Sequence, residues 1–199
     1  MAIEVKRKLF TVEEFQRMGE SGVFDSDARL ELLEGEILEM NAVGSRHVAV
    51  VNRLTRALVG RVGDRQIVSV QNPFVLDPRS QPQPDLLVLR AKDDDYYLAL
   101  PGPEDVLLAI EVSDSTLRHD TRKAVLYARE GVPEAWLVVL RGGPDTMTIR
   151  VFTDPTLDGY RQIRTLRHSG TLEPTSFECE PIPVREILKA PLPYLDDDA

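Results

Sequence analysis

The sequence has little cysteine and little histidine, and both shortages limit the chemistry that the chain can carry. Cys179 is the only cysteine among the 199 residues, so an internal disulfide and a thiolate cluster for zinc are both excluded. The three histidines, His47, His119 and His168, are scattered too widely along the chain to suggest a metal site. These residues alone therefore indicate neither a zinc site nor a disulfide framework.

Long apolar runs are also absent. No segment approaches the run of about 18 apolar residues that a membrane helix needs, and the stretch from Met1 to Lys8 contains no apolar signal core. We therefore expect a protein of the cytoplasm that does not enter the membrane. With 42% hydrophobic residues, the chain suits one domain with a substantial core. We expect that core at about residues 11–188, followed by a flexible acidic tail over 189–199.

Positive charge is in short supply. The 24 Lys and Arg residues are outnumbered by 33 Asp and Glu residues, which gives a net charge of −9, whereas a nucleic-acid-binding protein usually presents a basic surface. Screening confines exposed charges to about 8 Å at physiological salt, so a local basic face can still act. Part of the acid excess lies in Asp93–Asp95 and Asp196–Asp198, which we interpret as solvated surface. The candidate basic face for nucleic acid consists of Arg53, Arg56, Arg61 and Arg65.

In the first half of the chain, apolar spacing and turn residues predict helices and strands in alternation. Thr11 begins a short helix, because Glu14 three residues later completes a capping box. Arg29–Met40 predicts a β-hairpin with its turn at Glu34–Gly35. Ser45 is the expected N-cap of an amphipathic helix that ends at Gly60. Further strands are expected at Gln66–Val70, Phe74–Leu76, Pro84–Leu89 and Val106–Ser113.

The second half predicts one more long helix and several strands. Asp120 is the expected N-cap of a helix that Gly131 ends in a left-handed conformation. The polar stretch Ala91–Glu104 is expected to be an exposed loop that could face a substrate. The remaining expectations are a strand at Glu134–Leu140, a turn at Gly142–Asp145, an antiparallel pair at Met147–Phe152 and Tyr160–Leu166, and a short helix at Val184–Leu188. This order predicts an α/β sandwich with a mixed sheet.

Two apolar strands each carry one carboxylate at an end, and such a charge needs a reason. Asp85 stands at the start of its run, whereas Glu111 stands near the end of Val106–Ser113. If the two runs pair as antiparallel neighbours, Asp85 and Glu111 share one end of the sheet, because opposed Cα atoms lie roughly 4.5–5.5 Å apart. Two carboxylates that close repel each other unless a cation lies between them. The pair therefore predicts a site for a divalent metal such as Mg²⁺ or Mn²⁺.

These residues resemble the PD-(D/E)xK nuclease superfamily, and the surrounding motifs resemble its Uma2-like endonucleases, formerly a domain of unknown function. The matching pieces occur in the expected order and are Leu30–Leu38, His47, Pro84–Asp85, Glu111–Ser113, Asp120–Lys123, Tyr127 and Gly131–Val139. One departure is that Ser113 stands where the superfamily has a lysine two residues after the acid. The resemblance implies a restriction-endonuclease-like core, a metal held by Asp85, Glu111 and the carbonyl of Val112, and Lys123 in place of the missing cation.

Each further candidate has a functional and a structural interpretation. Glu31 could face solvent on its strand, while the resemblance implies a third acidic ligand. His47 lies in the first turn of a helix, where the macrodipole favours a neutral ring that orients a water or packs. Ser113 could cap the strand end, and Tyr127 could be a half-buried core residue. Lys123 could be an ordinary surface lysine on its helix. Its replacement by methionine is expected to change stability by only ~0.5 kcal/mol even if its amine reaches the site.

The function that we expect is hydrolysis of phosphodiester bonds in nucleic acid, with DNA as the substrate, by a metal-dependent endonuclease. Because endonucleases often cut as dimers, a homo-oligomer is also expected. Two alternatives stay open at this point. One is an inactive binding or scaffold module that keeps the fold, which the acidic surface and the missing motif lysine favour. The other is a metal-dependent hydrolase of small phosphoesters, which needs no basic groove.

Overall fold

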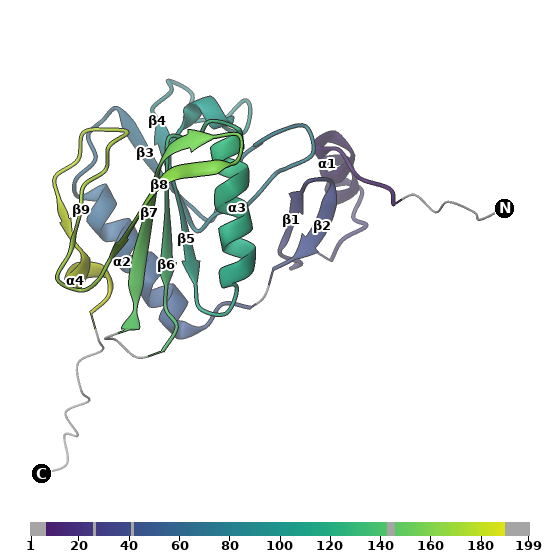
Figure 1. Cartoon of the computed structure of the whole chain (residues 1–199). Coiled ribbons are helices and arrows are strands. Elements are labelled where there is room, and N and C mark those ends of the chain that lie inside the picture. Colours follow the sequence, from purple (N-terminus) through teal and green to yellow (C-terminus); the bar gives the residue numbers. More distant parts are fainter. Residues whose placement is uncertain (1–6, 26, 41, 143–145, 190–199) are drawn as a thin grey trace, which may run out of the picture.

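The protein is described here from a computed structural model that covers residues 7–25, 27–40, 42–142 and 146–189. Its centre is a six-stranded sheet with the strand order β3-β4-β5-β6-β7-β8 (Figure 1). The strands are β3 (Gln66–Val70), β4 (Leu86–Arg90), β5 (Val106–Ser113), β6 (Glu134–Val139), β7 (Thr148–Thr156) and β8 (Gly159–Leu166). Every strand therefore lies beside its sequence neighbours.

The sheet is mixed, as expected from the sequence. All neighbouring strands are antiparallel except β5 and β6, which are parallel. A parallel pair needs a long crossover connection, and helix α3 (Leu117–Arg129) provides it. Gly131 ends this part of the chain in the predicted left-handed conformation, with a φ of +80°. The crossover places the first turn of α3 next to the end of β5, where Glu111 lies.

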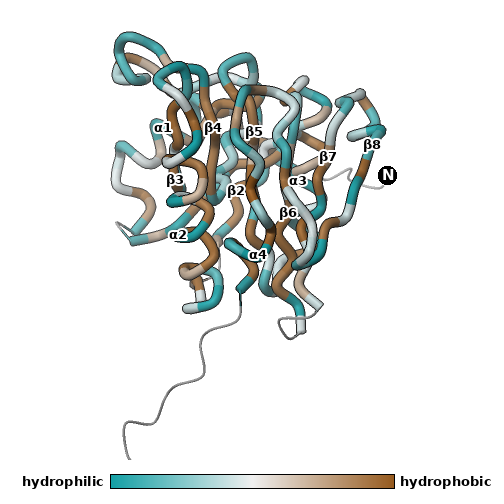
Figure 2. Tube along the Cα trace, turned by 90° about the vertical axis from the view of Figure 1, so that its left-hand side faces the viewer, coloured by the Kyte–Doolittle hydropathy of each residue, from teal (hydrophilic) through white to brown (hydrophobic). Residues whose placement is uncertain are grey.

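Helices cover both faces of the sheet and bury two apolar cores. On one face, α2 (Ser45–Val59) and α4 (Val184–Ile187) pack against side chains such as Ile110 and Trp136. On the other face, α3 packs through Tyr127 and its neighbours against Ala109 and Leu137. Figure 2 shows the hydrophobic stretches concentrated along the inner strands. Among the described residues, no helix combines the length and apolar character that crossing a bilayer would require.

The N-terminal part forms a small lobe beside α3 (Figure 1). It consists of α1 (Val12–Glu20) and the hairpin of β1 (Leu30–Leu33) and β2 (Glu36–Glu39). The predicted capping box of Thr11 and Glu14 is present at the start of α1. In the hairpin turn, Glu34 and Gly35 have φ values of +51° and +84°, the conformation that a two-residue turn of this kind requires. The Glu34 carboxylate also forms ion pairs with Arg122 and Arg129 of α3, which tie the lobe to the sheet.

Near the C-terminus, the expected helix after residue 183 is confirmed as α4, and a small sheet precedes it. The strands β9 (Thr171–Leu172) and β10 (Ile182–Pro183) pair antiparallel and were not expected from the sequence, because two-residue strands leave no alternation to detect. A 3₁₀ turn, η1 (Pro103–Asp105), leads into β5. The predicted turn at residues 143–145 and the tail at residues 190–199 lie outside the described residues.

Three boundary predictions were wrong. The N-cap of α2 is Gly44 rather than Ser45, and it makes no side-chain capping bond. Helix α3 begins one turn earlier than expected, with Thr116 at the N-cap position, while Asp120 lies in the first turn and accepts a hydrogen bond from the Thr116 hydroxyl at 2.5 Å. Residues 74–76 do not form a strand, because their amides bond to the loop carbonyls of Pro82, Pro101 and Ser80.

The polar loop Ala91–Glu104 is largely exposed, as expected, but it lies at the wrong end of the sheet to face the carboxylate site. It joins the end of β4 to the start of β5, whereas Asp85 precedes β4 and Glu111 lies near the end of β5. The two ends are separated by the length of a five-residue strand, about 16 Å. The expectation that this loop faces a substrate bound at Asp85 and Glu111 is therefore corrected.

Candidate active site

Asp85 lies where the sequence pattern placed it, at the start of β4 and opposite the end of β5. The ladder pairs Leu86 with Ile110, so the continuing register sets Asp85 against Glu111. The backbone amide of Val112 donates a hydrogen bond to Oδ2 of Asp85 at 2.8 Å. Nε2 of His47 lies 3.0 Å from each carboxylate oxygen. The Asp85 carboxylate is therefore buried and held by donors from β5 and α2.

His47 contributes one nitrogen to this contact and leaves the other without a partner. Because an ionised carboxylate only accepts hydrogen bonds, His47 donates to Asp85 through Nε2. Its Nδ1 is buried and has no hydrogen-bond partner among the described residues. The sequence placed His47 in the first turn of a helix, and the structure uses that position to aim the ring at the strand end. His47 thus orients Asp85, whichever chemistry the carboxylate performs.

Glu111 is the most strongly perturbed carboxylate of the site. Its Oε1 accepts a hydrogen bond from the Tyr127 hydroxyl at 2.6 Å and lies 2.8 Å from Nζ of Lys123. Burial raises the pKa of Glu111, the Lys123 charge opposes that rise, and the charges of Asp85 and Asp120 add to it, so that the pKa reaches about 8. Tyr127 is therefore a fully buried partner of Glu111 rather than a half-buried core residue.

Lys123 lies between two carboxylates of different elements. Its side chain is 2% exposed, and Nζ lies 2.8 Å from Glu111 and 3.1 Å from Oε2 of Glu31. Although burial alone would lower the pKa of Lys123, the two carboxylates raise it. The ammonium therefore stays charged inside the protein. The interpretation of Lys123 as a surface lysine is wrong, because its side chain is buried between two carboxylates.

Glu31 is buried rather than solvent-facing, and both of its oxygens have partners. Oε1 lies 2.7 Å from Nε2 of His119, while Oε2 accepts from the Gln83 amide at 3.2 Å and pairs with Lys123. Burial would raise the pKa of Glu31, but His119, Lys123 and the amide outweigh it and lower the pKa to about 2. Glu31 is thus the permanent anion that balances Lys123, while Glu111 can hold a proton.

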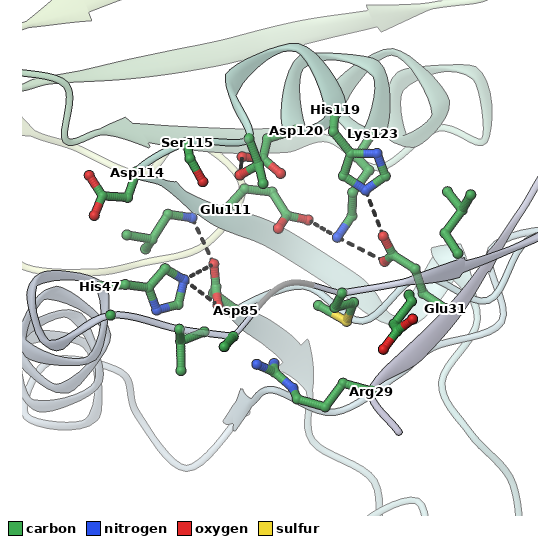
Figure 3. A pocket seen from close by; sticks show the side chains of 18 residues that line it. Arg29, Glu31, His47, Asp85, Glu111, Asp114, Ser115, His119, Asp120 and Lys123 are labelled. Carbon is green, nitrogen blue, oxygen red and sulfur yellow. Dashed lines mark hydrogen bonds and ion pairs between the residues drawn. The ribbon is translucent and has the colours of Figure 1, made fainter. Parts of the chain in front are cut away.

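These side chains line one pocket of about 360 Å³ between the N-terminal lobe and the sheet. Figure 3 shows Asp85 and His47 on one side and Glu31, Lys123 and His119 on the other, with Glu111 between them. The lobe supplies Arg29, Glu31 and residues 38–40, and α3 supplies residues from Thr116 to Lys123. A volume of this size is in the range of small-ligand sites. The pocket is open to a substrate at the strand ends.

The donors in this pocket suit a hard divalent cation. Val112 directs its amide towards Asp85, and because the amide and carbonyl of one strand residue face the same side, its carbonyl is directed there too. Two carboxylates and a carbonyl are oxygen ligands of the kind that Mg²⁺ prefers, with water completing its shell. Within the described residues, no group of three or more His, Cys, Asp or Glu side chains is arranged to hold a metal. A cation here would therefore keep several waters.

Ser113 stands at the position of the missing motif lysine and makes no cap. Its hydroxyl is fully buried and has no hydrogen-bond partner among the described residues. Since Ser113 is two residues from Glu111, both side chains lie on the same face of β5. The end of β5 thus presents a carboxylate and a hydroxyl without a partner to α3, and Lys123 of α3 lies 2.8 Å from that carboxylate.

The predicted basic face on α2 lies away from this pocket. Arg53 donates to the carbonyls of Ile187 and Lys189, and Arg61 pairs with Glu186, so both hold the C-terminal segment. Arg56 is exposed on α2 and is not among the pocket residues. A role for Arg53 and Arg56 in nucleic-acid binding stays a prediction.

Sequence reasoning missed His119 as a pocket residue. It lies one helical turn before Lys123 on α3, and residues four apart on a helix share a face. Both side chains reach Glu31, so the spacing was a usable signal once Lys123 was a candidate. Asp120 also lines the pocket, whereas it was expected from the sequence only as a helix cap and as part of the matching motif Asp120–Lys123.

Comparisons with known proteins show a similar solved structure and a matching protein family. A solved structure described as a putative nuclease belonging to DUF820 from Anabaena variabilis superposes with a TM-score of 0.67 at 13% identity, over 90% of this chain and 97% of that one. The chain therefore shares the mixed α/β fold of that structure. A family model described as "Uma2: Putative restriction endonuclease" matches residues 12–183, and the chain belongs to this Uma2 family. No curated protein matches the chain.

Proposed function

We propose that this protein is a metal-dependent endonuclease that hydrolyses phosphodiester bonds in DNA. The observation that supports it best is the meeting of Asp85, Glu111 and Lys123 in one pocket at the strand ends. Membership of a family of restriction-endonuclease type agrees with this chemistry. The pocket has many acids and few cations, so it needs a metal before it can accept a phosphate.

Asp85, Glu111 and the carbonyl of Val112 would hold the cation. When bound, Mg²⁺ or Mn²⁺ supplies Lewis-acid stabilisation of the phosphoryl group and makes a bound water more acidic. His47 and the Val112 amide keep the Asp85 carboxylate in place, and Tyr127 does the same for Glu111.

Lys123 has the role of a fixed positive charge. Its ammonium lines the pocket and stays protonated between Glu31 and Glu111. A cation held in this way stabilises negative charge that develops on the phosphate, and no reorganisation is needed at the moment of reaction. Glu31 and His119 keep Lys123 in position from the side of the N-terminal lobe.

The test is cleavage of supercoiled plasmid in Mn²⁺, Mg²⁺ or EDTA, with a chromogenic phosphodiester assayed in parallel. We expect nicking that requires the metal and is lost in Asp85→Asn and Glu111→Gln. Glu39→Gln, which removes an exposed acid at the same pocket, serves as the matched control and should keep activity. Turnover of the chromogenic substrate alone would indicate a hydrolase of small phosphoesters. Binding of DNA without any cleavage would indicate an inactive module.

A further inference from the structure

The hairpin of β7 and β8 carries unpaired positive charge on a chain that is otherwise acidic. Residues 159–172 contain Arg161, Arg164 and Arg167 and no Asp or Glu. Arg161 pairs with Asp154 near the turn of the hairpin. Arg164 and Arg167 are exposed, and neither they nor Arg150 of β7 form a side-chain hydrogen bond or ion pair within the described residues. We call Arg150 and Arg167 the edge arginines.

The strand registers connect these arginines to the site. Glu111 pairs with Leu137, Leu137 pairs with Arg150, and Arg150 pairs with Thr165. Directly opposed residues share one face of a sheet, so Arg150 lies in the same cross-strand row as Glu111, two strand spacings or about 10 Å away. Leu166 pairs with Ile149, and Arg167 follows it at the site end of the hairpin. Arg164 pairs with Val151 and therefore lies on the opposite face of the sheet from Arg150 and Glu111.

The edge position makes these side chains available from outside. β8 is the last strand of the sheet, and Figure 2 shows it at the margin of the molecule beside β7. Pairing of two copies through this edge would bring arginines of like charge together, and charged side chains are a common protection of sheet edges against such pairing. The surface therefore fits a partner with regularly spaced negative charge.

We infer that the edge arginines bind the phosphate backbone of nucleic acid beside the scissile bond. This inference rests on the proposed function for its substrate. Thr165 lies three strand spacings from Glu111, about 14 Å, and this distance corresponds to about four nucleotides along one strand. The basic face on α2 is a poorer candidate, because Arg53 and Arg61 are already bonded to the C-terminal segment.

The experiment compares three double charge reversals that change the net charge equally. Arg150→Glu with Arg167→Glu tests the edge, and Arg56→Glu with Arg65→Glu tests the α2 face. Arg79→Glu with Arg185→Glu is the control, because both residues are exposed and lie outside the site. Affinity for a fluorescent DNA duplex is measured by anisotropy in EDTA between 50 and 200 mM salt, approximately the range in which phosphate contacts change affinity steeply.

We expect the edge variant to lose about tenfold or more in affinity and the slope of log K against log salt to become shallower by about 2, since each lost phosphate contact removes about 0.9. The control should change little. Equal losses in all three variants, or a larger loss in the α2 variant, would overturn the inference. If the edge variant loses binding to polyglutamate but keeps its affinity for DNA, the inference is overturned as well, because the partner would then be an acidic protein.

Two further readouts separate this inference from the proposed function. The edge variant should hydrolyse the chromogenic phosphodiester like the wild type, which shows that the pocket is intact. If the wild type cleaves DNA and the edge variant binds it normally, the inference fails and the proposed function stands. If the wild type binds DNA through the edge but hydrolyses neither substrate, the proposed function fails and the inference stands.

Discussion

The ammonium of Lys123 lies 2.8 Å from Oε1 of Glu111, and both side chains are buried. A lysine of α3 is therefore buried as a charged group beside a carboxylate at the end of β5. The second carboxylate on this lysine, that of Glu31, comes from the N-terminal lobe. The stability of the fold and the proposed cleavage should therefore both depend on this lysine.

Lys123→Met should destabilise the protein by about 3–5 kcal/mol, the cost of removing one partner of a buried ion pair. The reason is that Glu31 would stay buried and charged without its cation. Urea unfolding measures the loss. In the double variant Lys123→Met with Glu31→Gln, part of the lost stability should return, because the charge left without a partner is removed as well. A loss within ~0.5 kcal/mol, as for a surface substitution, would show that the burial of Lys123 is misplaced.

Cleavage by Lys123→Met should fall by about 10²–10³, the scale of losing one preorganised electrostatic donor. Metal binding should persist, because lysine is not a ligand. Rates are compared at a temperature at which the melting curve shows the variant folded. Ser113→Lys in this background restores a cation on the same face of β5 as Glu111, beside a hydroxyl that has no partner. Recovery of cleavage is expected, whereas full activity of Lys123→Met alone would remove Lys123 from the mechanism.

Glu31 should stabilise the fold against acid. Its pKa in the folded protein is lowered to about 2 from 4.5, so its contribution is fully present above about pH 4.5 and is lost as the pH falls towards 2. A shift of this size corresponds to about 3 kcal/mol. The free energy of unfolding, measured from pH 6 to pH 2, should fall less steeply in Glu31→Gln. His119→Gln weakens the contact that holds Glu31 ionised, so the acid-induced loss of stability should begin at a higher pH in this variant. If the pH dependence between pH 6 and pH 2 is unchanged in both variants, this role of Glu31 is refuted.

Thermal melts with and without millimolar Mn²⁺ test the metal site. The wild type should gain stability, because a ligand that binds only the folded state raises its free energy of unfolding. Asp85→Asn and Glu111→Gln should gain none, while Glu39→Gln should gain as much as the wild type. The pKa of Glu111 is raised to about 8, and this value predicts the direction in which the Mn²⁺ effect changes with pH. Metal must displace its proton, so the Mn²⁺ effect should grow as the pH rises towards 8.

The central strands and their register could be predicted from the sequence because burial leaves a strong pattern. The run Val106–Ser113 is apolar except at Glu111 and Ser113, and the structure buries the whole strand. The hairpin turn at Glu34–Gly35 was also predictable, since few residues accept positive φ. The opposed placement of Asp85 and Glu111 followed from the antiparallel pairing of Val106–Ser113 with Pro84–Leu89.

The partners of each charged side chain could not be predicted in the same way. Glu31 alternates with apolar neighbours on its strand, and this pattern fits either a solvated or a buried carboxylate. Only the docking of the hairpin on α3 decides between them, through Lys123 and His119. Arg53 and Arg61 have the sequence signature of a basic face, but the C-terminal segment uses them for its own carbonyls and acid. Long-range contacts of this kind leave no local signal.

The docking of the N-terminal lobe sets an order of events for the active site. Glu31 is separated from Lys123 by 92 positions and sits in a two-stranded sheet that is not part of the main one. The six strands can pair without it, but Lys123 then faces the pocket with only one of its carboxylates. We therefore expect competence for chemistry to be the last property that a refolding chain acquires, after the sheet is complete. Docking of the N-terminal lobe is then the step that completes the surroundings of Lys123.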